Sequence, residues 1–284
     1  MKTILSLMSL PVIAVLVLGA APLCVVVVWS FWTWDPSTYW IRPELSLAGY
    51  AAIGEAGRWT VLLGTLFKAV LAASFCVVLA FPLAYAIRFL AGRRLALVLM
   101  ALITIPFFTS YLIRAFSWRL VLGRTGPVNE ALQSLGLIAE PLDWLLFSDF
   151  AIMVGFIASY LPFAAFPLIL AMQRVEPSLL KAAQDLGAGF WRIVGSIVIP
   201  LTLSGSFAGF LFVFVMVIGS QTEVQMLGGA GAPIVSIMIN DVMRVANFPL
   251  AFAISSVVLI CVFGVLLAGN RIFGLARLFE GMSK

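Results

Sequence analysis

Six side chains in this sequence could together carry a positively charged solute. Three of them are acids and three are aromatic rings: Asp149, Glu223, Asp241, Tyr111, Tyr160 and Phe214. A cation that leaves water needs carboxylates, carbonyls or ring faces in place of its hydration shell. Each acid can also be interpreted as the solvated end of an apolar segment, and each ring as packing. We take the six residues as a candidate substrate pathway, with those alternatives open.

Other chemistry finds little support in the sequence. The chain has no His, and its three cysteines lie in apolar stretches without CxxC spacing, so neither a metal site nor a disulfide framework is indicated. It has no GxxxxGK[ST] phosphate loop, so nucleotide chemistry must come from a partner. We therefore expect no catalytic residue and no bound cofactor in this chain, and an intramembrane enzyme is disfavoured.

The elements that position these residues are predicted to be membrane-spanning helices. Mean hydropathy is +1.15, and only 10% of residues are charged. A spanning helix needs roughly 20 mostly apolar residues, and six stretches qualify: Met8–Trp32, Trp59–Ile87, Leu95–Phe116, Leu146–Met172, Leu201–Gly219 and Phe248–Ile272. The first resembles a signal peptide, but its apolar run continues to Trp32, which favours an uncleaved span.

Charge gives the expected orientation, because basic residues mark the cytoplasmic side of short loops. With the N-terminus inside, the inner segments hold ten basic and three acidic residues, and the outer side holds seven basic and nine acidic ones. Both termini are then predicted to lie inside. The net charge of +5 reflects this sidedness and not nucleic-acid binding. Arg114 and Arg119 would repel a cation, so we expect them to pair with acids or to reach the membrane interface.

A polar segment, residues 173–200, interrupts the apolar chain between the fourth and fifth spans, and we call it the coupling segment. Glu176 and Pro177 favour a helix start, and Gly187 favours a stop, which leaves a helix of about nine residues. An apolar face with helical spacing is expected on it, made of Leu179, Ala182, Ala183 and Leu186. Such a short helix needs a partner or the ends of its own spans to hold it.

Pro200 and two glycines shape the expected fifth span. Pro200 removes a backbone donor and is predicted to separate a short cytoplasmic piece, Phe190–Ile199, from that span. Gly205 and Gly209 form a small-residue face suited to close helix packing.

The coupling segment resembles the "EAA" loop of membrane subunits of bacterial ABC importers. Ala182-Ala183 is followed four residues later by Gly187, and after nine more residues by Ile197–Pro200 (IVIP). Other stretches resemble the spermidine/putrescine (PotB-type) branch: Ile105–Trp118 (IPFFTSYLIRAFSW), Leu122–Gly126 with Asn129, Tyr160–Phe163, Glu176–Leu180 and Asp185–Ala188. The resemblance covers roughly residues 55 to 275.

The resemblance implies an all-α, six-helix type I importer fold with both termini inside, in a bacterial inner membrane. It implies a second permease subunit, two ATPase subunits that bind ATP and Mg, and a periplasmic binding protein. The residues expected to contact the ATPase are Glu176, Leu179, Lys181, Ala182, Ala183, Asp185, Leu186 and Gly187. The expected solute is a small organic cation such as a polyamine. A GABA-like amine, an opine or thiamine is the alternative, and an ion-coupled secondary transporter is the rival class.

Two positions depart from the family pattern. Lys181 stands where the family usually has Glu before Ala-Ala, which puts the identity of the partner ATPase in doubt. Ser220 stands where an acid often follows Gly219, with Glu223 three positions later, which puts the identity of the solute in doubt. The expected organisation is a first helix and outer loop (1–58), a five-helix core (59–275) that contains the coupling segment, and a cytoplasmic tail (276–284).

Overall fold

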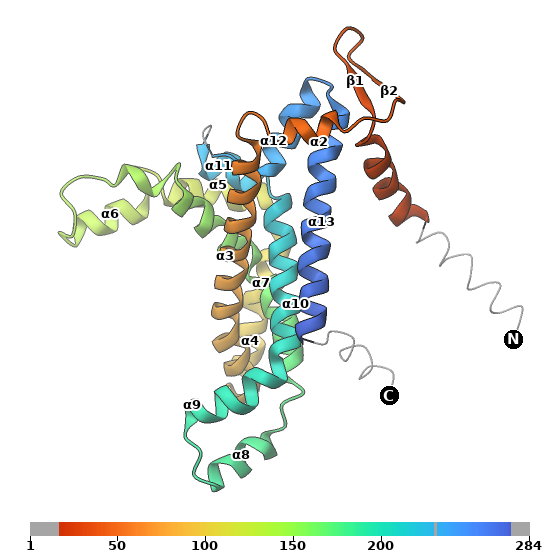
Figure 1. The fold of residues 1–284 in the computed structure, drawn as a ribbon. Coiled ribbons are helices and arrows are strands. Elements are labelled where there is room, and N and C mark those ends of the chain that lie inside the picture. Colours follow the sequence, from red (N-terminus) through yellow and green to blue (C-terminus); the bar gives the residue numbers. More distant parts are fainter. Residues whose placement is uncertain (1–16, 230–231, 274–284) are drawn as a thin grey trace, which may run out of the picture. The chain divides into compact units, whose positions relative to one another are not determined.

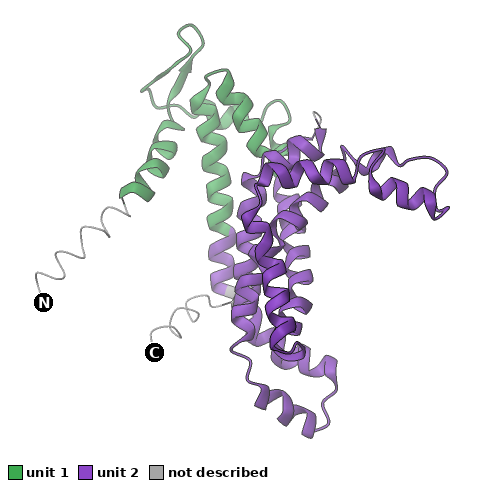
Figure 2. Ribbon diagram, turned by 180° about the vertical axis from the view of Figure 1, so that it is seen from behind, with its two compact units in different colours: residues 1–63, 235–264 green, residues 64–234, 265–284 purple. Residues whose placement is uncertain are grey.

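A computed structural model describes residues 17–229 and 232–273. The described residues are mostly helical, and their one sheet is a two-stranded hairpin (Figure 1). They separate into two compact units, which Figure 2 shows in green and purple: residues 1–63 with 235–264, and residues 64–234 with 265–284. The division falls inside α3 (Arg58–Tyr85) and inside α13 (Phe248–Phe273).

The first unit carries the hairpin and three short helices. Its elements besides the parts of α3 and α13 are the apolar helix Val17–Trp29, β1 (Thr33–Asp35), β2 (Trp40–Arg42), α2 (Ala48–Ile53) and α12 (Val235–Arg244). The strands are antiparallel, with Thr33 opposite Arg42. Hydrogen bonds from Ser37 to Asp35, with the Arg42 guanidinium, hold the pKa of the Asp35 carboxyl well below its usual value. The hairpin turn is thus fixed by an ionised carboxylate.

The second unit contains the coupling segment and most of the predicted pathway. Its helices are α4 (Arg93–Thr104), α5 (Tyr111–Val121), α6 (Pro127–Ser134), α7 (Asp149–Met172), α8 (Pro177–Asp185), α9 (Phe190–Ile193), α10 (Ile199–Gly219) and α11 (Thr222–Leu227). A π-helical turn, Ala86–Leu90, extends α3, and a second, Val194–Val198, joins α9 to α10. Short 3₁₀ turns lie at Ile105–Phe108 and Asp143–Leu145.

Four described helical stretches are long and apolar enough to cross a membrane. They are Arg58–Leu90, Asp149–Met172, Phe190–Gly219 and Phe248–Arg271. They confirm four of the predicted spans, with shifted ends. The predicted first span, Met8–Trp32, begins outside the described residues, and its described part contains the helix Val17–Trp29.

The predicted span Leu95–Phe116 is not a single helix, because it is broken by a sharp bend. Two helices, Arg93–Phe108 and Tyr111–Val121, meet there at 103°. Thr109 and Ser110 are extended between them, with ψ values of 137° and 135°. The Pro106 carbonyl at the break accepts hydrogen bonds from the Thr109 hydroxyl (2.9 Å) and from Arg114 Nη1 (3.1 Å). The Thr109 N–H also donates to this carbonyl (3.4 Å), so the last carbonyl before the break is satisfied by the 3₁₀ turn and by two side chains.

The predicted break at Pro200 is also wrong. The helix runs without interruption from Phe190 to Gly219, with Pro200 in the first turn of α10. Pro is tolerated in a first turn, and here the turn before it is π-helical. A π-bulge changes the backbone pairing inside a helix without ending it.

The predicted small-residue face of α10 is confirmed, and it packs against α7. A Cβ added at Gly209 would lie 2.8 Å from the Ala164 carbonyl oxygen and 3.0 Å from the Ala164 Cα. A Cβ at Gly205 would lie 2.7 Å from the Pro167 carbonyl oxygen. These distances leave no room for a side chain, so the two backbones touch through glycine.

Asn129, at the start of α6, holds the loop that leads from α5 to α7. It is fully buried. Its amide nitrogen donates to the carbonyls of Gly123 (3.1 Å) and Leu142 (3.5 Å), and its amide oxygen accepts from the Leu142 N–H (2.8 Å). One side chain thus joins backbone segments 19 positions apart.

We expect Asn129→Ala to lower the thermal stability of the purified protein by about 1–3 kcal/mol, because buried backbone groups lose their partners. Ser134→Ala is the matched control, since the Ser134 hydroxyl bonds only its own exposed helix. A thermal melt in detergent measures both variants. An Asn129→Ala melt that overlays the wild type would contradict the assigned role.

Candidate coupling surface and substrate pathway

The helix α8 has the bounds that the sequence predicts. Glu176 precedes it as N-cap, Pro177 begins it, and it is nine residues long. Gly187 follows the C-cap with a φ of +80°, which L side chains rarely adopt. The Gly187 N–H bonds the Gln184 carbonyl (2.8 Å), and the Ala188 N–H bonds the Ala183 carbonyl (2.9 Å). This pair of bonds is the Schellman motif, so glycine at this position ends the helix.

One side of α8 packs on its own chain, and the predicted apolar face does not. The buried residue of α8 is Leu180, at 8% exposure. Leu179 and Leu186, on the predicted face, are 45% and 89% exposed. Ala182, Lys181 and Asp185 are exposed as well, and Ala183 is half-buried. The helical spacing therefore places the apolar face as the sequence predicts, and this chain leaves most of that face exposed.

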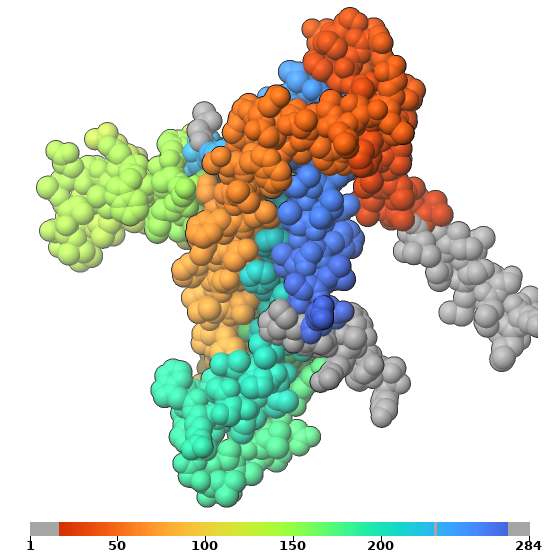
Figure 3. Space-filling model, viewed as in Figure 1, coloured from red at the N-terminus to blue at the C-terminus, as the bar shows by residue number. Residues whose placement is uncertain are grey.

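The coupling segment protrudes at one end of the second unit, where Figure 3 shows it in green and teal. Arg88, at the end of the α3 helix, donates to the Val175 carbonyl just before α8 (3.5 Å). Tyr85 meets Phe190 of α9 edge-on, with ring centroids 5.8 Å apart. A displacement of α8 would therefore pull on α3 and, through α9, on the continuous helix that contains α10.

Glu223 is the centre of a buried polar cluster. It is 3% exposed, and its Oε2 accepts a hydrogen bond from the Ser220 hydroxyl at 2.7 Å. The Tyr160 hydroxyl, from α7, interacts with the side chains of Ser220 and Glu223 and with the charge of Arg114. The hydrogen bond therefore holds the Glu223 carboxylate next to Ser220, the position at which the sequence departs from the family pattern.

A small cavity of about 210 Å³ opens on α5 and α7 in the same unit. It is lined by Tyr111, Arg114, Ser159 and the turn around Thr109. Ser159 is 1% exposed, and neither its hydroxyl nor the Arg114 Nε has a hydrogen-bond partner among the described residues. Buried polar atoms are usually hydrogen-bonded, so these two make the cavity a candidate site.

The structure brings some of the predicted pathway residues together and leaves others apart. Tyr160 and Glu223 meet in the cluster, and Tyr111 lines the small cavity on α5 and α7. Phe214 is buried and stacked on Phe210 (5.8 Å), which supports the packing interpretation. Asp149 makes an ion pair with Lys68 in another cavity. Asp241 is exposed on α12, in the first unit.

Arg114 and Arg119 make no ion pair with an acid in the part of the chain that the structure describes. Arg114 donates to the Pro106 carbonyl, and Arg119 lies over the Phe147 ring, 5.3 Å from its centroid. The sequence analysis missed Ser159 and Lys68 as site residues. A lysine inside a predicted apolar span was the available signal for Lys68. Ser159 gave no signal, because serine is common in such helices.

Four described helices long and apolar enough to cross a membrane fit an integral membrane protein. Residues 76–270 match the family described as binding-protein-dependent transport system inner membrane component. The chain belongs to this family. It is a permease of the ABC importer type, a transport component rather than an enzyme, and a multi-pass protein of the bacterial inner membrane.

Two curated relatives cover most of the chain. The inner membrane ABC transporter permease protein YdcU of Escherichia coli (strain K12) is 32% identical over 246 residues, which are 82% of this chain and 78% of that protein. The spermidine/putrescine transport system permease protein PotB of Salmonella typhimurium (strain LT2) is 32% identical over 239 residues, which are 84% and 82%.

Solved structures show the same fold at low identity. A bacterial alginate ABC transporter, crystallised with a periplasmic protein bound to an alginate pentasaccharide, matches with a TM-score of 0.74, 18% identity and 96% coverage of both chains. The MetNI methionine ABC transporter in an inward-facing conformation matches with a TM-score of 0.52 and 17% identity, over 77% of this chain and 97% of that chain.

Proposed function

We propose that this chain is one of two permease subunits of an ATP-driven importer that moves a small organic cation, with a polyamine such as spermidine or putrescine as the first candidate. The observation that carries the proposal is the uncovered apolar face of α8. The importer has two ATPase subunits, which bind the ATP and Mg, and one of them docks on that face. The contact set is the predicted one: Glu176, Leu179, Lys181, Ala182, Ala183, Asp185, Leu186 and Gly187.

The same proposal fixes the orientation. The chain has six spans with both termini and α8 in the cytoplasm, and a periplasmic binding protein delivers the solute to the other end. The second permease subunit is a homologue and not a copy, as the PotB-type resemblance implies. Closure of the ATPases moves α8, and the movement reaches α3 and α10 through the Arg88–Val175 and Tyr85–Phe190 contacts.

The buried carboxylate of Glu223 is the proposed contact for an ammonium group. An ionised acid in the core of a membrane protein is costly unless a cation or hydrogen bonds compensate it. Ser220 and Tyr160 supply hydrogen bonds, and a passing amine supplies the positive charge. The permanent charge of Arg114 nearby favours the second candidate, a solute that carries an acidic group as well as an amine, such as a GABA-like amine or an opine.

We expect Glu223→Gln to reduce uptake of putrescine by about ten- to a hundredfold in kcat/KM, since a hydrogen bond to a charged group contributes about 1.5–3 kcal/mol. The assay is uptake of labelled putrescine into proteoliposomes that contain the assembled complex and its binding protein. Gln225→Glu, on the same helix, is the control for helix integrity. If Glu223→Gln takes up putrescine as fast as the wild type does, Glu223 is not the ammonium contact. If the wild-type complex also transports 4-aminobutyrate in preference to putrescine, the second candidate replaces the first.

A further inference from the structure

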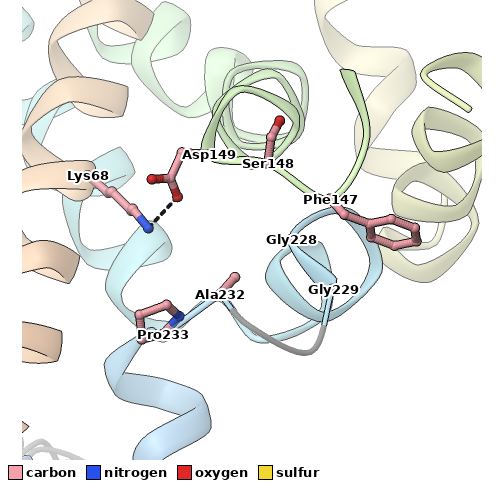
Figure 4. A pocket seen from close by; sticks show the side chains of 8 residues that line it. All are labelled: Lys68, Phe147, Ser148, Asp149, Gly228, Gly229, Ala232 and Pro233. Atoms are coloured by element: carbon pink, nitrogen blue, oxygen red, sulfur yellow. Dashed lines mark ion pairs between the residues drawn. The ribbon is translucent and has the colours of Figure 1, made fainter. Parts of the chain in front are cut away.

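Lys68 and Asp149 form an ion pair at the wall of a cavity of about 620 Å³. The Lys68 Nζ lies 2.5 Å from the Asp149 Oδ1, and Figure 4 shows the two side chains directed toward each other from neighbouring helices. The other lining residues are Phe147, Ser148, Gly228, Gly229, Ala232 and Pro233. None of these carries a charge, so one carboxylate faces one ammonium.

The two partners of this pair differ in exposure. The Lys68 side chain is 16% exposed, and the Asp149 side chain is 74% exposed. A lysine placed well inside a spanning helix is costly without a partner, so Asp149 is what holds its ammonium in place. Asp149 keeps free surface toward the cavity, where a second, mobile ammonium could approach.

The position of the pair suits a solute that arrives from outside. Asp149 is the first residue of α7, and α8 follows the other end of the same helix. Twenty-four helical residues span about 36 Å at 1.5 Å each. The cavity therefore lies at the opposite end of the second unit from the coupling segment, which is the periplasmic end in the proposed orientation.

We propose that Asp149 and this cavity are an entry site for the primary ammonium group of the transported solute, and that Lys68 occupies the site itself in this conformation. The lysine side chain is a tethered butylammonium, chemically the same group that ends putrescine. A tethered ligand competes at an effective concentration in the millimolar range or above, so it keeps free amines out until the helices move. The idea rests on the proposed function, because it requires an amine solute.

The test is amine binding by the purified complex without its binding protein, with the shift in melting temperature as the readout. We expect Lys68→Ala to be stabilised by n-butylamine and by putrescine with an apparent Kd at least tenfold lower than in the wild type. n-Butanol, the neutral analogue, should stabilise neither protein. Lys68→Met keeps the stem without the charge and should change in the same direction, which covers a failure of the alanine variant to fold.

The matched control is the double variant Lys68→Ala with Asp149→Asn, which should bind neither amine. Equal amine affinity in wild type and both single variants would overturn the proposal, and so would a double variant that still binds. ATP-driven uptake by the same preparations separates this result from the proposed function: an active importer with no amine site here refutes only the entry site.

Discussion

Leu186→Asp should insert and assemble normally in the membrane and lose ATP-driven uptake. Leu186 is 89% exposed, so a charge there disturbs no internal packing. The substitution places a carboxylate in the apolar face of α8. That carboxylate must lose its water when a partner covers the face. Ala183→Asp and Gly187→Asp should also abolish transport, the second by altering the turn that requires a positive φ.

Gln184→Asp is the matched control for Leu186→Asp. It adds the same charge to an exposed position of the same helix, outside the face of Leu179 and Leu186. Uptake into vesicles and membrane abundance are measured for both variants. Full uptake by Leu186→Asp, at wild-type abundance, would show that this face is not where energy enters.

Gly209→Leu should prevent the second unit from folding. A Cβ at this position already meets backbone atoms of Ala164 at 2.8 to 3.3 Å, and backbone cannot move aside as a flexible side chain can. The helices α7 and α10 would have to separate along their whole contact. Overpacking costs about 1–3 kcal/mol, and occasionally more, where neighbours can adjust. Here we expect a loss of monodisperse protein in size-exclusion chromatography.

The matched control is Gly219→Ala at the end of the same helix, where an added Cβ meets nothing within 4 Å. That variant should elute and melt like the wild type. A normal profile for Gly209→Leu would show that α7 and α10 do not pack as described.

Local features could be predicted from the sequence because adjacent residues determine them. The bounds of α8 follow from Pro177 and Gly187, and its stripe follows from the helical repeat of Leu179 and Leu186. The long apolar spans follow from hydropathy alone. The bend after α4 was also encoded locally, in Pro106 and the extended Thr109 and Ser110, but a hydropathy window averages over a break of two residues.

Long-range pairings could not be predicted. The face of Gly205 and Gly209 shows that a helix approaches closely, but nothing in one sequence says that α7 is that helix. Lys68 and Asp149 are 81 positions apart, and their pairing exists only once α3 and α7 are side by side. The break expected at Pro200 failed because a π-helical turn, which has no clear sequence signature, accommodates the proline.

The structure treats the two departures from the family pattern differently: Ser220 has a partner, and Lys181 has no ion-pair partner among the described residues. At Ser220 the structure supplies a compensation, since its hydroxyl holds the Glu223 carboxylate at 2.7 Å. At Lys181 it supplies none: the side chain is exposed, and no described residue makes an ion pair with it. The choice of ATPase partner is therefore expected to depend on this lysine.

The central claim is that ATP hydrolysed on the α8 side drives uptake of an amine. Proteoliposomes that hold the assembled complex, with the α8 side facing the lumen, test it directly. We predict that labelled putrescine, presented outside with the binding protein, accumulates only when ATP and Mg are enclosed, and that ionophores do not prevent it. Accumulation driven by an ion gradient without ATP would contradict the account and would place the chain among secondary transporters.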